Sequence, residues 1–119
     1  MAAKKVKIGI MPSDKFQQRV IDIAAGRIKP KQGEPKIWFH SMKSLAEVLS
    51  DSNRALLKII AEQNPNTITE LAEISGREPS NLGRTLKMFE RYGFIKMQQA
   101  ARSKRPIAQY TDFDISVSA

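Results

Sequence analysis

The side chains that could do chemistry gather in the last third of the chain, and they are cationic rather than catalytic. Between Arg77 and Arg105 there are eight basic and two acidic residues, a net charge of +6 in a chain whose total is +8. Clustered lysine and arginine attract a polyanion, and nucleic acid is the commonest such partner. A merely solvated surface would mix the two signs more evenly. We therefore expect this segment to meet nucleic acid.

A helix that begins near Pro79 and closes at Gly93 would hold the centre of this segment. Its apolar residues form one stripe, made of Leu82, Leu86 and Phe89. The opposite face is then expected to carry side chains that read base edges, namely Asn81, Arg84, Thr85 and Met88. Asparagine pairs with adenine and arginine with guanine, while threonine contacts a base or a phosphate and methionine a thymine methyl group. Polar residues face outward on most surface helices, which is the alternative explanation.

Further cations follow this helix. The segment Ala100–Pro106 has three basic residues and no acidic one, and we expect it to be the loop between strands Phe94–Gln99 and Ile107–Ile115. Long cations on such a loop can reach phosphates or the minor groove, whereas a solvated turn is the alternative. The residues expected at a DNA interface are Thr69, Arg77, Ser80, Asn81, Arg84, Thr85, Lys87, Met88, Arg102, Lys104 and Arg105.

Other chemistry finds little support in the composition. The chain has no cysteine, and its one histidine, His40, has no clustered acid or hydroxyl partner. Asp112 and Asp114 share a strand face, but a pair of carboxylates without further ligands is weak evidence for a metal site. We expect no catalytic residue, no metal and no cofactor. The lack of cysteine fits the cytoplasm, and no apolar run reaches the roughly 20 residues needed to cross a bilayer.

Three helices and a hairpin would position the cationic residues. The first helix spans roughly Arg54–Gln63 after a capping cluster, and the second opens at Thr67, whose spacing from Glu70 is that of a capping box, and ends at Gly76. The third is the helix described above, and two strands follow it. This order is that of a winged helix-turn-helix, in which the third helix enters the major groove.

Particular runs of this sequence resemble known regulators. The runs Ile68–Ala72, Ser80–Lys87 and Tyr92–Ile95 resemble winged-helix transcription regulators of the MarR and ArsR kind. The pattern Ser-x-x-x-Leu-Ala-x-Val-Leu at Ser41–Leu49, after an aromatic strand, is similar to a narrower family of small prokaryotic DNA-binding regulators, some of them antitoxins paired with toxins. The resemblance implies a transcriptional regulator that binds double-stranded DNA, with an autoregulating antitoxin and a toxin partner as a further reading.

The N-terminal part reads as a strand, a helix and a second strand. The expected fold is therefore α+β, a winged helix-turn-helix with an N-terminal strand-helix-strand extension, divided into residues 1–40 for dimerisation and 41–119 for DNA binding. Trp38 and Phe39 expose more apolar surface than so small an element can bury alone, and helix-turn-helix proteins usually bind as two-fold dimers. The expected homodimer interface comprises Val6, Ile8, Ile10, Phe16, Val20, Ile23, Trp38 and Phe39.

Several alternatives stay open. The residues of the N-terminal part could form an extended monomer core instead of an interface. A winged helix could also serve as a protein-interaction module, with its basic face against an acidic protein surface. RNA binding would more often use exposed aromatic residues, and membrane binding an interfacial amphipathic helix, so both are less favoured. Salt-dependent binding to duplex DNA, tested with and without sequence preference, separates DNA binding from the protein-interaction role.

Overall fold

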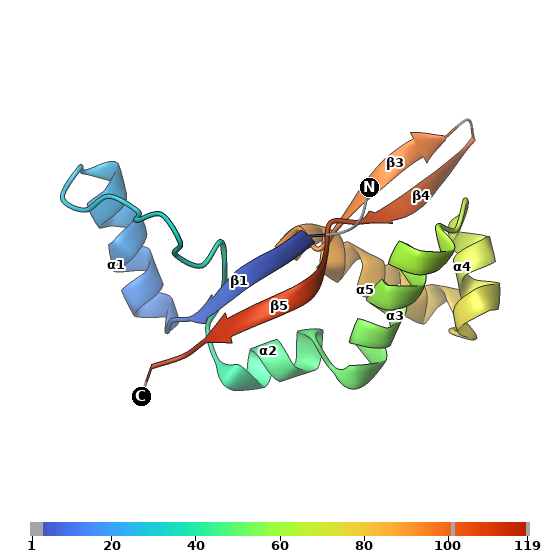
Figure 1. The fold of residues 1–119 in the computed structure, drawn as a ribbon, viewed down its shortest axis with the longest axis horizontal. Coiled ribbons are helices and arrows are strands. Elements are labelled where there is room, and N and C mark those ends of the chain that lie inside the picture. The colour runs from blue at the N-terminus through green and yellow to red at the C-terminus, as the bar shows by residue number, and fades with distance from the viewer. Residues whose placement is uncertain (1–3, 101, 119) are drawn as a thin grey trace. The chain divides into compact units, whose positions relative to one another are not determined.

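The computed structural model describes residues 4–100 and 102–118, which form a mixed α+β fold. The elements are β1 (Lys4–Ile10), α1 (Ser13–Ala24), β2 (Ile37–Phe39), α2 (Met42–Val48), α3 (Asp51–Gln63), α4 (Ile68–Ser75), α5 (Pro79–Tyr92), β3 (Ile95–Ala100), β4 (Ser103–Ala108) and β5 (Tyr110–Ser116). The chain forms a larger unit, Met1–Lys5 with Val48–Asp112, and a smaller unit, Val6–Glu47 with Phe113–Ala119. Figure 1 shows both.

In the larger unit, helix α3 begins and ends where local chemistry requires. The Ser50 side chain caps it by accepting a hydrogen bond from the backbone N–H of Asn53 at 3.2 Å. Asn64 ends it in the left-handed conformation, with φ of 47°. Leu56, Leu57 and Ile60 are buried and form the inward face of the helix.

Helix α4 follows after four residues. Thr67 Oγ1 accepts a hydrogen bond from Glu70 N–H at 2.9 Å, while Glu70 Oε2 accepts one from Asn66 N–H at 3.3 Å. The expected capping interaction at Thr67 is thus confirmed, with the return bond going to Asn66. Gly76 ends the helix with φ of 73°, a conformation that costs a non-glycine residue energy.

Helix α5 carries the expected inner stripe. Leu82, Leu86 and Phe89 are all buried, and Phe89 meets Phe94 edge to face with ring centres 6.1 Å apart. Gly93 ends the helix in the left-handed region, as expected. Strand β3 packs against α5, and β4 packs against α3 and α4, so the three helices and the hairpin share one core (Figure 1).

The hairpin differs from its expected form. Strands β3 and β4 pair antiparallel from Ile95↔Ala108 to Ala100↔Ser103, so the expected loop Ala100–Pro106 is wrong; of that loop, Ala101 lies outside the described residues. Pro106 is accommodated because a two-stranded sheet has only edge strands. The expected strand Ile107–Ile115 is also wrong, because β4 ends at Ala108 and β5 starts at Tyr110, with the intervening Gln109 N–H donated to the Phe94 carbonyl at 2.8 Å.

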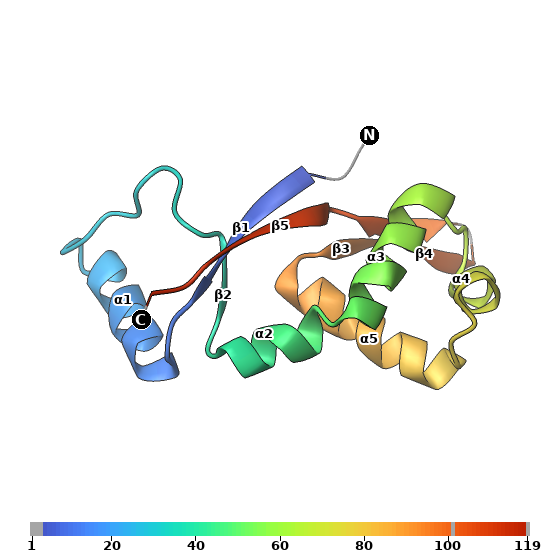
Figure 2. The same cartoon turned by 60° about the horizontal axis from the view of Figure 1, so that its bottom comes forward.

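The smaller unit contains the expected strand, helix and strand. Its sheet has the order β2-β1-β5, and β1 and β2 run parallel with Gly9 opposite Trp38. Helix α1 makes the crossover that parallel neighbours require, and an irregular segment of residues 25–36 leads on to β2 (Figure 2). The Ser41 side chain caps the start of α2 by accepting a hydrogen bond from Ser44 N–H at 3.0 Å.

Candidate nucleic-acid interface

The outward face of α5 carries a row of cations. Arg84, Lys87 and Arg91 are exposed and stand three, four and seven residues apart, which places them on one side of the helix. Within the described part of the chain, no hydrogen bond or ion pair engages these three side chains. Arg91 was not among the expected site residues, although its spacing from Arg84 and Lys87 was the signal that could have found it.

The base-reading residues expected on the same face have different environments. Asn81 is exposed beside Arg84, and Met88 is half-exposed. Ser80 is exposed, but its hydroxyl donates a hydrogen bond to Glu78 Oε1 at 2.5 Å, so it is partly committed to the turn before α5. Thr69 is exposed near the start of α4.

Thr85 corrects the expected assignment. It is only 9% exposed, its hydroxyl donates to the Asn81 carbonyl at 3.2 Å, and it accepts a hydrogen bond from Arg77 Nη1 at 3.3 Å. The prediction that Thr85 faces outward to read bases is therefore wrong. The physical reason is helical spacing, because position 85 is three residues after Leu82 and four before Phe89, on the buried stripe itself.

Arg77 is likewise turned toward protein acceptors. Its Nη2 donates to the Ser52 carbonyl at 2.9 Å, to Ser52 Oγ at 2.8 Å and to Asn53 Oδ1 at 3.0 Å. The side chain joins the segment between α4 and α5 to the first turn of α3. The expected DNA contact of Arg77 competes with these bonds, because both terminal nitrogens of the guanidinium are engaged.

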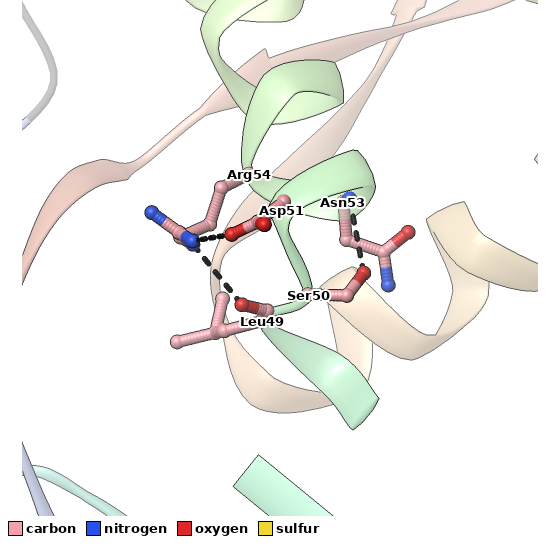
Figure 3. Close-up of polar contacts among 5 residues, drawn as sticks. All are labelled: Leu49, Ser50, Asp51, Asn53 and Arg54. Carbon is pink, nitrogen blue, oxygen red and sulfur yellow. Dashed lines mark hydrogen bonds and ion pairs between the residues drawn. The ribbon is translucent and has the colours of Figure 1, made fainter. Parts of the chain in front are cut away.

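The start of α3 is itself held by polar contacts (Figure 3). Arg54 forms an ion pair with Asp51 and donates from Nε to the Leu49 carbonyl at 3.1 Å. The Asn53 side chain lies away from this pair in Figure 3, and its Nδ2 donates to the Val48 carbonyl at 3.0 Å. The amide of Asn53 is therefore fixed in orientation, with its oxygen presented to Arg77.

The hairpin separates its cations onto two faces. Lys104 pairs with Gln99 and Arg105 with Gln98 in the ladder, and successive residues of a strand point to opposite faces. Arg102 and Lys104 are exposed, whereas Arg105 is half-buried, with Nη1 3.5 Å from Asn66 Oδ1. Among the described residues, Arg105 Nε is buried and has no hydrogen-bond partner. The cations that we expected to cluster at one loop tip do not all share one surface.

A comparison with protein families bears on this part of the chain. The family described as HVO_A0114 matches residues 48–115, which is more than half of the sequence. The chain belongs to the HVO_A0114 family. The HVO_A0114 segment starts at the end of α2 and includes α3, α4, α5 and the hairpin, and therefore all the cationic residues considered above. No curated protein and no solved structure matches the chain.

Helix α1 lies outside the HVO_A0114 segment and has an unusual surface. None of its residues is buried, and Val20 and Ile21 are 50% and 52% exposed. With Phe16, Ile23 and Trp38, the Val20 side chain lines a groove of about 460 Å³ in the smaller unit. These four residues belong to the expected dimer interface and are accessible.

The other expected interface residues are not accessible. Val6, Ile8 and Phe39 are 3% exposed or less, so the prediction that they lie on a surface open to a partner is wrong. The cause is the strand period, because alternate residues of β1 face the interior. Ile10 is half-buried at the end of the strand.

Trp38 forms a wall of the groove and is held from two sides. Arg19 lies over its ring, 5.5 Å from the ring centre, and forms an ion pair with Glu34. A backbone hydrogen bond from Lys31, followed by the contact with Arg19, lowers the pKa of Glu34 below its usual value. A Cβ atom built at Gly9 would lie 2.4 Å from Trp38 Cζ3, so the ring rests directly on the glycine backbone.

The structure describes the single histidine of the chain and all of its acidic side chains. No group of three or more histidine, cysteine, aspartate or glutamate side chains among them is placed to hold a metal ion. His40 Nδ1 lies 3.2 Å from the Met11 carbonyl and its ring meets Phe16 edge to face. Over the same described residues, none of the helices has the length and apolar character needed to span a membrane.

Proposed function

We propose that this protein binds double-stranded DNA in a sequence-specific manner, as a winged helix-turn-helix transcriptional regulator. In this proposal α5 enters the major groove and the β3–β4 hairpin is the wing. The observation that carries it is the exposed row of Arg84, Lys87 and Arg91 on α5, cations with no acceptor among the described residues. Three cations that are neighbours on one helix face repel one another, and a bound polyanion would neutralise them.

The side chains divide into two roles. Asn81 and Arg84, at the N-terminal half of α5, are suited to the edges of adenine and guanine in the major groove. Lys87, Arg102 and Lys104 are suited to phosphates, since a lysine ammonium or a cation on a turn makes contacts that carry no sequence information. The structure of α5 supports this division because its exposed face is continuous from Asn81 onward.

We further propose that the protein acts as a homodimer, with a second copy of the chain on the exposed face of α1. Half-exposed Val20 and Ile21 give this face apolar area that a partner would cover. Helix α1 carries two acidic and two basic residues, a net charge of zero, so two copies of it can approach without the repulsion expected of a chain with charge +8. Two-fold symmetry predicts an inverted-repeat site with half-site centres about 10 base pairs apart or a multiple of that.

An antitoxin role with a toxin partner is a narrower form of the same proposal, supported only by the resemblance of Ser41–Leu49. The rival function is a protein-interaction module. It makes a different prediction, because an acidic protein partner would not give the counterion release that a phosphate backbone gives.

The test is a salt titration of binding to two duplexes, one selected from a random-sequence pool and one unrelated. Arg84→Ala should weaken binding to the selected duplex by about 1–3 kcal/mol and change the unrelated one little, because a base contact is lost. Lys104→Ala should weaken both alike and reduce the slope of log affinity against log salt by about one. Lys58→Ala, which removes an exposed charge from α3, is the matched control and should change neither.

Two outcomes would contradict the proposal. Binding to duplex DNA that is absent, or that does not depend on salt, would remove nucleic acid as the partner of α5. Equal losses on both duplexes from Arg84→Ala, with a reduced salt slope, would make Arg84 a phosphate contact and would end the assignment of base readout to this helix.

A further inference from the structure

We infer that Arg77 is a positioning residue that sets the orientation of α5, and that it does not itself contact DNA. The inference rests on the proposed function, because it concerns how α5 is presented to the duplex. It reverses the sequence-based expectation, in which Arg77 was one more cation of the interface.

The hydrogen bonds of Arg77 connect three parts of the larger unit. Arg77 lies between α4 and α5, its Nη2 reaches Ser52 and Asn53 in the first turn of α3, and its Nη1 reaches Thr85 in α5. A guanidinium is planar and holds its donors in fixed directions, so it can bridge two elements where a lysine ammonium offers a single point charge. One side chain therefore fixes α5 against α3.

Both ends of this bridge are themselves fixed. On the α3 side, Asn53 is held by its bond to the Val48 carbonyl. On the α5 side, the Thr85 hydroxyl gives its proton to the Asn81 carbonyl, so that its oxygen can accept from Arg77. The result is a continuous polar chain from the start of α3 to the helical turn that carries Asn81.

Orientation matters because base readout tolerates little error. Side-chain tips on a helix lie about 5–6 Å from the axis, so a rotation of α5 by about 10° moves them by about 1 Å. A shift of that size takes a hydrogen bond of 2.9 Å out of range, whereas a phosphate contact through a flexible lysine can follow it. Loss of the Arg77 bridge should therefore reduce discrimination between sequences more than it reduces affinity for DNA in general.

The experiment compares Arg77→Lys with two substitutions of Thr85 on the same two duplexes. Arg77→Lys keeps the charge but not the bridge, and Thr85→Val removes the acceptor without any change of charge. Both should reduce the ratio of the two affinities about tenfold while the salt slope stays at the wild-type value. Thr85→Ser keeps the hydroxyl and should retain the wild-type affinity ratio. This distinguishes the effect of losing the hydrogen bond from the effect of a packing defect at position 85.

The opposite pattern overturns the inference. If Arg77 contacts a phosphate, Arg77→Lys retains the wild-type affinity ratio, Arg77→Ala reduces the salt slope by about one, and Thr85→Val leaves binding to both duplexes unchanged. Urea unfolding of each variant shows whether it is folded, and a variant that fails to fold is replaced by Ser52→Ala, which removes one exposed acceptor of the bridge.

Failure of the proposed function would show in the wild-type protein as absence of DNA binding, so it is distinguished from failure of the positioning role. If the wild type binds no duplex DNA, the bridge is measured by hydrogen exchange of the α5 backbone amides. Exchange should be faster in Arg77→Lys and Thr85→Val than in the wild type and Thr85→Ser, and equal rates in all four proteins would overturn the positioning role.

Discussion

Replacing Gly9 by alanine should displace Trp38 and destabilise the smaller unit. The added Cβ atom would lie 2.4 Å and 2.7 Å from Cζ3 and Cε3 of Trp38 and 2.9 Å from Cγ of Pro35. Ordinary carbon contacts are about 3.5–4.0 Å, so the ring has to move by about 1 Å. The movement also disturbs the contact with the Arg19 guanidinium, which lies 5.5 Å from the centre of the ring.

The size of the effect follows from these contacts. Overpacking of a closely packed site costs about 1–3 kcal/mol, and an exposed cation–π contact contributes about 0.5–1 kcal/mol of its own. We therefore expect Gly9→Ala to lower the free energy of unfolding by about 1–3 kcal/mol. Trp38 is the only tryptophan, so its fluorescence during urea unfolding reports on the site itself.

Gly83→Ala is the matched control. It adds the same methyl group within α5, where no heavy atom beyond the neighbouring residues and backbone of the helix itself lies within 4 Å of the new Cβ. Alanine is favoured over glycine inside a helix by about 0.5–1 kcal/mol. This variant should be more stable than the wild type by far-ultraviolet circular dichroism. An unchanged emission maximum and urea midpoint in Gly9→Ala would refute the packing of Trp38 on Gly9, and equal destabilisation of both variants would show that the loss is not specific to this site.

Three other predictions are checked on the same protein. Thr67→Ala should lower the stability of the larger unit by about 1 kcal/mol because the α4 cap is lost, while Thr69→Ala, on the exposed face of the helix, should not. The pKa of Glu34 is lowered in the folded state, chiefly by a backbone hydrogen bond from Lys31, so its contribution to stability is present above the ordinary pKa of an unfolded glutamate and is lost as the pH falls through the folded value. Glu34→Gln should remove that acid-dependent loss of stability, measured by tryptophan fluorescence. Light scattering should give twice the chain mass of 13.4 kDa for the wild type and 13.4 kDa for Val20→Glu, and a monomeric wild type would exclude the α1 dimer.

The helices of the larger unit could be predicted because their boundaries depend on local chemistry. A serine or threonine cap accepts a hydrogen bond from an N–H only three residues away, and a glycine at a helix end needs only its own left-handed backbone conformation. The helix boundaries at Ser50, Thr67, Gly76 and Gly93 can therefore be predicted without knowledge of the fold. Thr85 could also have been placed correctly, since its spacing from Leu82 puts it on the inner stripe. Its spacing of four residues from Asn81 predicts the outer face instead, and the structure shows that the spacing from Leu82 is the one that holds.

The role of Arg77 could not be predicted in the same way. Its acceptors Ser52 and Asn53 lie 25 and 24 residues earlier in the chain, and no local pattern connects them. The prediction of the loop Ala100–Pro106 was wrong for a different reason. Pro106 and its basic neighbours have the composition of a turn, and only the ladder, in which Pro106 lies opposite Met97, shows that an edge strand can hold them.

Not every basic residue between Arg77 and Arg105 is free to contact DNA. The net charge counts all eight basic residues between Arg77 and Arg105 alike, but Arg77 donates to Ser52, Asn53 and Thr85, and Arg105 is half-buried beside Asn66. At most six cations then remain for phosphates, and five if Arg84 contacts a base edge. The six are Arg84, Lys87, Arg91, Lys96, Arg102 and Lys104. Because each phosphate contact contributes about −0.9 to the slope of log affinity against log salt, one protomer should give a slope no steeper than about −5, whereas eight contacts would give about −7. A slope measured near −7 per protomer would mean that Arg77 and Arg105 leave their internal acceptors to reach the phosphates, and the positioning role of Arg77 would then be lost in the complex.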